Sequence, residues 1–167
     1  AAGADRITAS GQKLVSFKPG GHWTRSLLPS PDGKKLYAGV GSSSNIAEMG
    51  MEVEEGRAAI YELDLADGSS RIFAGGLRNA VGMEREPNTG VLWTVVNERD
   101  AIGDETPPDY LTSVRQGGFY GWPYSYWGQT VDERVQPQNP ALVATAIAPD
   151  YALGGHTASL GLCWLPA

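Results

Sequence analysis

Several features that direct a chain to a well-defined protein class are missing from this sequence. Its single cysteine, Cys163, excludes an internal disulfide and a metal site built on two thiolates. The net charge is −6 and no run of basic residues is present, whereas nucleic-acid binding needs a basic face. No apolar stretch approaches the ~18 residues of a membrane-spanning helix, and the opening AAGADRITAS has neither the basic start nor the apolar middle of a signal peptide. We therefore expect no nucleic-acid partner and no membrane span.

Long stretches with helical periodicity are also missing. The apolar runs are short, alternate with polar residues or are continuous, and end at Gly, Pro, Asn or Asp, which is typical of β-strands. We predict strands at residues 13–17, 35–40, 58–65, 71–75, 91–96 and 111–115. The segments SPDGKK, LADGSS and EPNTGV carry the Asp-Gly or Asn-x-Gly residues of hairpin turns, which predicts antiparallel meanders. The acidic segment 50–57 is assigned to a loop rather than to a helical turn.

One short phrase occurs three times, as GGHWTRSLL (20–28), GGLRNAVGM (75–83) and GGHTASLGL (154–162). Units of a few short strands that repeat along a chain are typical of a β-propeller, in which each blade buries its faces against its neighbours. Equivalent positions of successive blades then converge on one central channel. We therefore expect His22, Arg78 and Thr157 to lie near one another, each just before an innermost strand.

The fold class predicted from this pattern is all-β, and the architecture is a β-propeller. A β-sandwich is the alternative, since the number of strands alone does not exclude it. At this repeat length the 167 residues make about three blades, whereas closed propellers have four to eight. The expectation is that residues 1–167 form a partial propeller domain and belong to a longer chain.

Five longer motifs in the sequence resemble those of a known protein family. They are GGHWTRSLLPSPDGKKLY, GLRNAVGM, TGVLWTVVNERDAIGDE, GGFYGWPYSYWGQ and PDYALGGHTASLGL. Over residues 20–162 the sequence resembles the glucose/sorbosone dehydrogenase family, and within it the L-sorbosone dehydrogenase branch. The resemblance implies a six-bladed propeller, periplasmic or secreted, that uses pyrroloquinoline quinone (PQQ) and calcium to oxidise a sugar or sugar aldehyde. The preferred sugar, the electron acceptor and the formation of a homodimer stay open.

The resemblance also implies roles for individual residues. His22 matches the catalytic base of the family, and an imidazole with a pKa near 6.5 suits the removal of a hydroxyl proton at neutral pH. Arg78 and Asn79 match residues that bind the quinone, and Thr157 matches a position where backbone and hydroxyl groups contact it. The parallel N–H groups of a guanidinium suit quinone or carboxylate oxygens, which a lysine cannot contact in the same way.

Calcium is the second cofactor that the resemblance implies. The loop 97–105 is rich in carboxylates and carboxamides, whose hard oxygens suit Ca²⁺. In the family the equivalent loop gives backbone carbonyls to the ion. Here these would come from Glu98, Arg99 and Asp100, in place of the more usual Gln-Gly-Pro. Asp104 and Glu105 match the family and are assigned to a structural ion or to holding the next loop.

The segment 117–129 is rich in aromatic residues. Its YGWP is expected to form a rigid corner that packs one blade against the next. Trp127, or Tyr126, is assigned to stacking on the sugar. His156 is assigned to a substrate contact, and both a second acid/base role and a role in holding its loop stay open.

Two other functions stay open. The first is a propeller that binds a sugar or a protein partner without a cofactor. It is favoured by the Glu98-Arg99-Asp100 sequence and by Gly21, where relatives with glucose activity have an acidic residue. The second is a calcium-dependent lactone hydrolase, which we rank last because no matching carboxylate stands at the position of His22 or Arg78.

Overall fold

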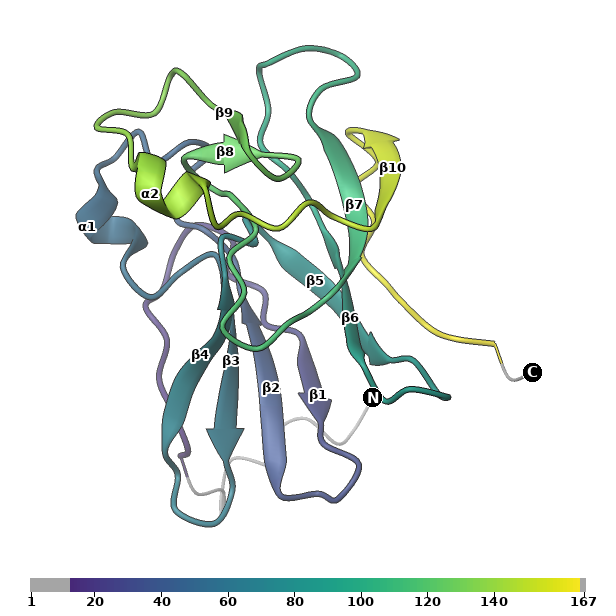
Figure 1. Cartoon of the computed structure of the whole chain (residues 1–167). Coiled ribbons are helices and arrows are strands. Elements are labelled where there is room, and N and C mark those ends of the chain that lie inside the picture. Colours follow the sequence, from purple (N-terminus) through teal and green to yellow (C-terminus); the bar gives the residue numbers. More distant parts are fainter. Residues whose placement is uncertain (1–12, 166–167) are drawn as a thin grey trace, which may run out of the picture.

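The computed structural model describes residues 13–165, which form two four-stranded antiparallel sheets. The first sheet contains β1 (Leu27–Pro29), β2 (Lys35–Val40), β3 (Ala59–Asp64) and β4 (Ser70–Gly75). The second contains β5 (Ala80–Arg85), β6 (Leu92–Val96), β7 (Pro108–Ser113) and β10 (Tyr151–Gly155). In each sheet the strands pair in chain order, so both sheets are meanders (Figure 1).

The predicted turns all join paired strands. Between β1 and β2, Ser30 Oγ donates to Asp32 Oδ1 at 2.6 Å. Between β5 and β6, the Glu86 carboxylate accepts from the backbone N–H groups of Asn88 at 3.0 Å and Thr89 at 2.7 Å. Side chains that hydrogen-bond the backbone two or three residues later fix tight turns. The hairpins predicted from these segments are therefore confirmed.

Five of the predicted strands are present, with small shifts at their ends, as β2, β3, β4, β6 and β7. The strand predicted at 13–17 is wrong, because this segment pairs with neither sheet. It is held by side chains instead: the Phe17 ring lies 5.1 Å from the Tyr61 ring. The loop assignment for 50–57 is also wrong, since α1 (Met51–Glu54) forms one helical turn there.

The chain makes a long excursion between β7 and β10. It contains β8 (Ser125–Tyr126), β9 (Thr130–Val131) and α2 (Pro140–Val143), which gather with α1 at one end of the molecule (Figure 1). Tyr120 N donates to Gly75 O at 2.9 Å and Trp122 N donates to Gly76 O at 3.1 Å, so the YGWP corner joins the second sheet to the first. Neither helix of residues 13–165 is long and apolar enough to cross a membrane.

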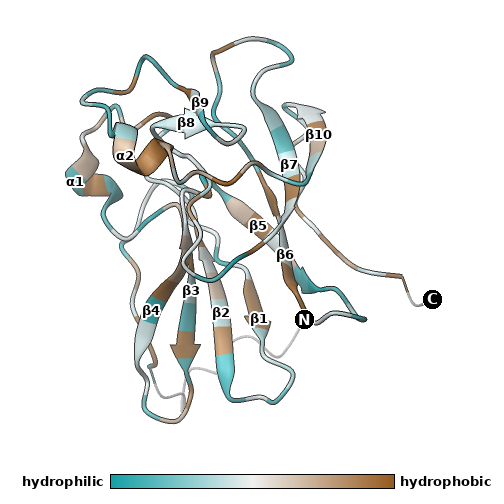
Figure 2. Cartoon of the chain, viewed as in Figure 1, coloured by the Kyte–Doolittle hydropathy of each residue, from teal (hydrophilic) through white to brown (hydrophobic). Residues whose placement is uncertain are grey.

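The hydrophobic core is shared by the two sheets. It includes Tyr37, Ile60 and Ala74 of the first sheet and Met83, Leu92, Val96 and Tyr110 of the second. Leu77, in the link between β4 and β5, is fully buried among them. Figure 2 shows the hydrophobic residues concentrated on the strands, whereas the turn between β5 and β6 is hydrophilic. Consecutive meanders that bury their faces against one another are blades of a propeller, whereas an immunoglobulin-type sandwich exchanges strands between its sheets.

The described residues contain two complete blades. β1 begins at the end of the first copy of the repeated phrase and β5 begins inside the second, so a strand follows His22 and Arg78 as predicted. The strand predicted after Thr157 is wrong, because residues 158–165 form no strand and lie against the second sheet. The backbone of Gly161 lies 2.8 Å from the position of a Cβ at Gly82, and the Trp164 ring lies 5.7 Å from the Trp93 ring.

Candidate functional site

The repeated phrases meet at one cavity of about 210 Å³. It is lined by His22, Arg78, Asn97, Glu98, Asp100, Asp109, His156 and Ala158. His22 and Arg78 therefore share one opening, as the repeat predicts, while Thr157 stands beside the lining residues His156 and Ala158. A complete small-molecule site has ~300–1,000 Å³, so this cavity alone is smaller than such a site. A larger hollow of about 560 Å³, between residues 46–52 and 134–137, contains none of the predicted site residues.

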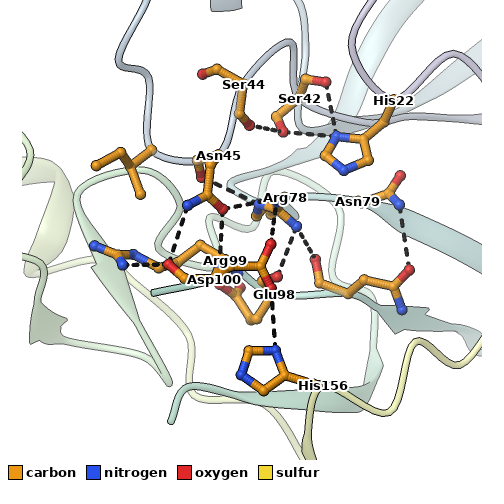
Figure 3. A network of polar contacts seen from close by, with 12 residues as sticks. His22, Ser42, Ser44, Asn45, Arg78, Asn79, Glu98, Arg99, Asp100 and His156 are labelled. Carbon is orange, nitrogen blue, oxygen red and sulfur yellow. Dashed lines mark hydrogen bonds and ion pairs between the residues drawn. The ribbon is translucent and has the colours of Figure 1, made fainter. Parts of the chain in front are cut away.

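His22 is held through one nitrogen of its ring. Its Nδ1 lies 3.0 Å from the carbonyl oxygen of Ser42 and 3.1 Å from Ser42 Oγ. That hydroxyl donates its own hydrogen to Ser44 O at 2.6 Å. Both Ser42 oxygens are therefore acceptors, which assigns the hydrogen to Nδ1 and leaves Nε2 with a lone pair. Figure 3 shows the other ring nitrogen turned away from Ser42.

The charge state of His22 follows from its surroundings. Burial lowers the pKa of the imidazole from its usual 6.5, and the guanidinium groups of Arg78 and Arg57 lower it further. The hydrogen bond to Ser42 and the charge of Glu54 oppose the shift without reversing it. The ring is therefore neutral at pH 7, and its Nε2 is able to accept a proton.

Arg57 fixes the loop that carries His22. Its guanidinium is buried and donates to the carbonyl oxygens of Lys18 at 2.9 Å, Gly20 at 2.7 Å and Ser42 at 3.2 Å. Sequence reasoning did not identify this residue, which follows an acidic segment and has no motif around it. An arginine directly before the apolar run of β3 is the signal that could have indicated a buried cation.

The second glycine in each of the first two copies of the repeated phrase is required by close backbone contacts. Gly21 has φ 56°, and a Cβ there would collide with Cα of Ser43 and lie 2.5 Å from the carbonyl oxygen of Ser42. Gly76 has φ 71°, and a Cβ there would lie 2.7 Å from the backbone nitrogen of Gly121. Only glycine combines this backbone conformation with such contacts. The glycines bring His22 and Arg78 to their places.

Arg78 ties together two loops at the cavity (Figure 3). Its Nε and NH2 donate to the backbone and side-chain oxygens of Asn45, at 3.2 and 3.0 Å. Its NH1 donates to the carbonyl oxygens of Glu98 at 2.7 Å and Asn97 at 3.3 Å. Asp100 Oδ2 lies 3.9 Å from NH2. The guanidinium is thus buried and surrounded by oxygen atoms of the chain.

Asn79 and Thr157 lie just outside the cavity. Asn79 is buried, and its Nδ2 donates to Asn97 Oδ1 at 3.4 Å. Thr157 Oγ1 donates to Asp109 Oδ2 at 3.1 Å. Asp109 also accepts from the backbone N–H of Glu98 at 2.7 Å, so it links the loop that contains Glu98 to the segment that contains Thr157. It was not predicted, although an aspartate inside an apolar strand is a signal that could have identified it.

Glu98 contributes a buried carboxyl group to the cavity. Its Oε2 accepts from the backbone N–H of Arg99 at 3.1 Å, while Oε1 has no partner among the described residues. Burial raises the pKa of this carboxyl to about 7, although the Arg99 backbone and the charge of Arg78 act in the opposite direction. Near neutral pH the group therefore exchanges a proton rather than carrying a fixed charge.

His156 stands at the exposed mouth of the cavity. Its Nδ1 lies 3.2 Å from Asp100 Oδ1 and its Nε2 lies 3.1 Å from the carbonyl oxygen of Gly103. Both partners are acceptors, so both contacts are satisfied when both ring nitrogens carry hydrogen. The hydrogen bond to Gly103 and the Asp100 carboxylate raise the pKa of this imidazole. The cavity thus holds two histidines whose pKa values are shifted in opposite directions.

The predicted sugar contact, Trp127, lies away from the cavity of His22. Its ring packs edge-on against Tyr110, with the ring centroids 6.4 Å apart, and is partly buried against the hydrophobic core. Its assignment to stacking on a sugar stays a prediction.

The carbonyl oxygens predicted to bind calcium, in residues 98–100, are poor ligands here because arginine side chains already donate to two of them. The carbonyl oxygen of Glu98 accepts from Arg78 at 2.7 Å, and that of Asp100 accepts from Arg99 NH1 at 2.6 Å. A guanidinium bound to the same oxygen repels a divalent cation placed beside it. The Arg99 side chain is itself buried in an ion pair with Asp132 at 2.6 Å.

The acidic side chains do not supply a calcium site either. Asp104 and Glu105 are exposed. Residues 13–165 contain no group of three or more His, Cys, Asp or Glu side chains that could hold a metal ion. We therefore derive no step through calcium.

A quinone that carries carboxylates fits the donor set better. The guanidinium of Arg78 provides a cation in the cavity. Its NH2 uses one hydrogen for Asn45 Oδ1, so the other is able to donate to a carboxylate or quinone oxygen in a charge-assisted hydrogen bond. The nearby carboxylates of Asp100 and Asp109 already accept hydrogen bonds from the chain itself. The residues present fit one side of a quinone site.

Similar folds occur among solved sugar oxidoreductases. An iodide structure of a Trichoderma reesei carbohydrate-active enzyme of family AA12 matches with a TM-score of 0.71 and 23% identity, covering 85% of this chain and 45% of that one. The holo form of the pyranose dehydrogenase PQQ domain from Coprinopsis cinerea matches with a TM-score of 0.67 and 24% identity, over 84% and 44%. The apo form of the soluble aldose sugar dehydrogenase from Escherichia coli matches with a TM-score of 0.56 and 20% identity, over 84% and 43%. These similarities confirm the fold class, a partial β-propeller.

Sequence comparison gives the family. An uncharacterized protein of Borreliella burgdorferi is 27% identical over 143 residues, which are 84% of this chain and 36% of the relative. The chain thus spans less than half the length of the relatives it matches. Residues 2–131 match the TrAA12-like family. The narrower sorbosone dehydrogenase branch stays a prediction, but the match covers most of the sequence, and the chain belongs to the TrAA12-like family.

Proposed function

We propose that this chain provides one side of the active site of a quinone-dependent sugar dehydrogenase, in which His22 removes the proton of the reacting hydroxyl. The observation that carries the proposal is the unprotonated Nε2 of His22 in a cavity that also contains Arg78 and His156. The fold neighbours include a pyranose dehydrogenase PQQ domain and an aldose sugar dehydrogenase, which supports a pyranose or another aldose as the substrate class. A sugar aldehyde of the sorbosone type is the narrower form of the proposal.

The proposed chemistry divides between the cofactor and the chain. Oxidation of an alcohol to a carbonyl removes a hydride from carbon and a proton from oxygen, and PQQ, when bound, supplies the acceptor for the hydride. His22 Nε2 accepts the proton. The Nδ1–H bond to Ser42 orients the ring toward the hydroxyl while it becomes cationic. Arg78, with Asn79 beside it, and Thr157 would hold the anionic groups of the cofactor when it is bound, and His156 would contact the substrate.

The remaining walls of the site are part of the same proposal. Since this chain covers under half of the solved propellers that it matches, residues outside it would complete the binding of quinone and sugar. We place residues 1–167 as a partial propeller domain of such a protein, acting in the periplasm or outside the cell.

The test is dye-linked sugar oxidation by the whole protein that carries these residues. The protein is incubated with PQQ and a panel of pyranoses, other aldoses and sugar aldehydes, and reduction of an electron-accepting dye is followed. His22→Ala should lower kcat by ~10²–10⁴-fold, the usual contribution of a general base. Arg115→Ala, at an exposed site outside the cavity, is the matched control. Sugar binding without any dye reduction would instead support the non-catalytic binding protein.

A further inference from the structure

We infer that Ser42, whose position is fixed by Arg57 and Glu54, selects the ring tautomer of His22. It would thus orient the imidazole in place of a carboxylate. The inference rests on the proposed function only for the statement that His22 is the base. Its structural part concerns which ring nitrogen carries the hydrogen and what fixes it there.

The first step is the double attachment of His22 to one residue. The carbonyl oxygen of Ser42 accepts from the backbone N–H of His22 at 3.0 Å and from Nδ1 of the same residue at 3.0 Å. Backbone and ring are thus anchored to the same atom, which restricts the side-chain torsions of His22. The preceding residue, Gly21, has no side chain that could orient the ring.

The second step is the orientation of the serine hydroxyl. Ser42 Oγ donates to Ser44 O at 2.6 Å, so its lone pairs face Nδ1 of His22 at 3.1 Å. A hydroxyl alone accommodates either tautomer, because it is both donor and acceptor. Here its hydrogen is already used, and only the Nδ1–H form of the ring satisfies both Ser42 oxygens.

The third step is the support behind Ser42, which comes from one end of α1. Glu54 accepts from the backbone N–H of Ser43 at 2.7 Å and from Ser44 Oγ at 2.6 Å. Arg57, one turn further, donates to Ser42 O at 3.2 Å and to Gly41 O at 3.0 Å. Both side chains are buried. The segment 41–44, directly after β2, is therefore held by the Glu54 carboxylate and the Arg57 guanidinium, which belong to one short segment of the chain.

The consequence is a base whose partner is neutral. Of the charged groups around His22, Arg78 and Arg57 disfavour the imidazolium and Glu54 favours it. The other titratable groups of the same cavity are Glu98, Asp100, Asp109 and His156. A carboxylate in the position of Ser42 would favour the imidazolium and keep the ring protonated at higher pH. Ser42, as a neutral partner, has the opposite effect, and Nε2 of His22 stays free to accept a proton at neutral pH.

The test is nitrogen-15 NMR of the histidine side chains in the whole chain. The sequence contains only two histidines, so long-range proton–nitrogen spectra resolve both, and His156→Asn assigns them. We expect His22 to carry its hydrogen on Nδ1 at pH 7. A hydrogen on Nε2 in the wild-type chain overturns the inference.

Variants test the source of the selection. Arg57→Met should increase the share of the Nε2–H tautomer about fivefold, the value of one net hydrogen bond, and Arg57→Lys should restore part of the wild-type ratio. Ser42→Asp keeps the carbonyl and adds a charge, so the midpoint of the His22 titration should shift upward. Arg115→Ala should leave both quantities unchanged. An unchanged midpoint in Ser42→Asp contradicts the inference even when Arg57→Met fails to fold.

These results are separable from the proposed function. Dye reduction by a protein whose His22 carries its hydrogen on Nε2 would support the proposed function and contradict the role of Ser42. The Nδ1–H form in a protein that reduces no dye would support the role of Ser42 and contradict the proposed function.

Discussion

His22 and His156 share one cavity, but their surroundings shift their pKa values in opposite directions. Burial and Arg78 lower the first, whereas the Gly103 carbonyl and Asp100 raise the second. The Glu98 carboxyl of the same cavity has a pKa of about 7, so the prediction is made for Glu98→Gln, which removes that titration. Since protonated Nε2 accepts no proton, kcat/KM of the whole protein with this substitution should fall only below pH 6.5. The measurement is a pH–rate profile. Adding His156→Asn should leave the acid limb in place, and an acid limb above 6.5 in Glu98→Gln would contradict the assignment of His22.

Gly41 lies directly against the proposed base and leaves no room for a side chain at its own position. A Cβ on residue 41 would lie 2.5 Å from Cβ of His22 and 3.2 Å from Cγ of Asn79. Gly41→Ala should therefore displace the imidazole and lower kcat by about 10²-fold, as a misplacement of ~1 Å does. Gly75→Ala is the matched control, because nothing lies within 4 Å of its Cβ position. Equal kinetics of the two variants would show that the ring tolerates displacement.

Some residues of the site could be predicted from the repeated phrase, whereas others act only through contacts with distant parts of the sequence. His22 and Arg78 could be predicted because the repeat marks equivalent positions of two blades. A charged residue beside an apolar run could have indicated that Arg57 and Asp109 are buried. The roles of Ser42, Arg57 and Asp109 could not be predicted, because each acts through contacts with segments far away in the sequence, which neither composition nor spacing records. Arg57 reaches back to the carbonyl of Lys18, for example.

Among the elements, the first sheet is tied together by Glu62 on β3. Its carboxylate binds Lys35 at 2.9 Å and Tyr37 at 2.8 Å on β2, and Arg71 at 2.8 Å on β4. Burial alone would raise the pKa of Glu62, but these three partners lower it from 4.5 to about 2. The contribution to stability is therefore complete above pH ~4.5 and decreases as the pH falls toward 2.

Glu62→Gln should accordingly lower the free energy of unfolding at pH 7 by ~1–3 kcal/mol, the usual value for hydrogen bonds to a charged group. The measurement is urea unfolding at pH 7 and pH 3. The difference from wild type should shrink at the lower pH, because the wild type then loses part of the same contribution. The same difference at both values would mean that the ionised carboxylate is not what stabilises the sheet.

The loop 97–105 is a second element whose behaviour follows from its contacts. Its carbonyls at Asn97, Glu98 and Asp100 already bind guanidinium or amide groups. Calcium should therefore leave the Tm of the chain unchanged, and a chelator should have no effect. Because a ligand that binds only the folded state raises Tm, a saturable increase with calcium would show that Arg78 gives way to the ion.

Elements could be predicted where the side-chain pattern itself decides the structure. β2, β3 and β6 carry apolar runs that both neighbours bury, and hairpin turns with their own hydrogen bonds delimit them. The alternation at 13–17 is just as regular, but Phe17 packs on Tyr61 without any strand pairing. α1 spans four residues and has no side-chain cap, so it is too short for helical periodicity to appear in the sequence.

On the scale of the whole molecule, the two blades share one core, and Leu77 lies where they meet. Its side chain is fully buried, and its backbone N–H donates at 3.0 Å to the carbonyl oxygen of Ala58, directly before β3. A core common to both sheets implies that neither blade is stable alone, because each buries its inner face only against the other. The described residues should therefore unfold in a single cooperative transition.

Leu77→Ala tests this coupling. It should lower the free energy of unfolding by ~2–5 kcal/mol, the usual cost of truncating a buried leucine. Amide hydrogen exchange should show β2–β3 and β6–β7 losing protection by the same amount, since both depend on the same opening. Leu65→Ala, at a side chain with 39% exposure, should change stability by no more than ~0.5 kcal/mol. Loss of protection confined to one sheet would mean that the blades fold independently and that His22 and Arg78 are held together by the loops alone.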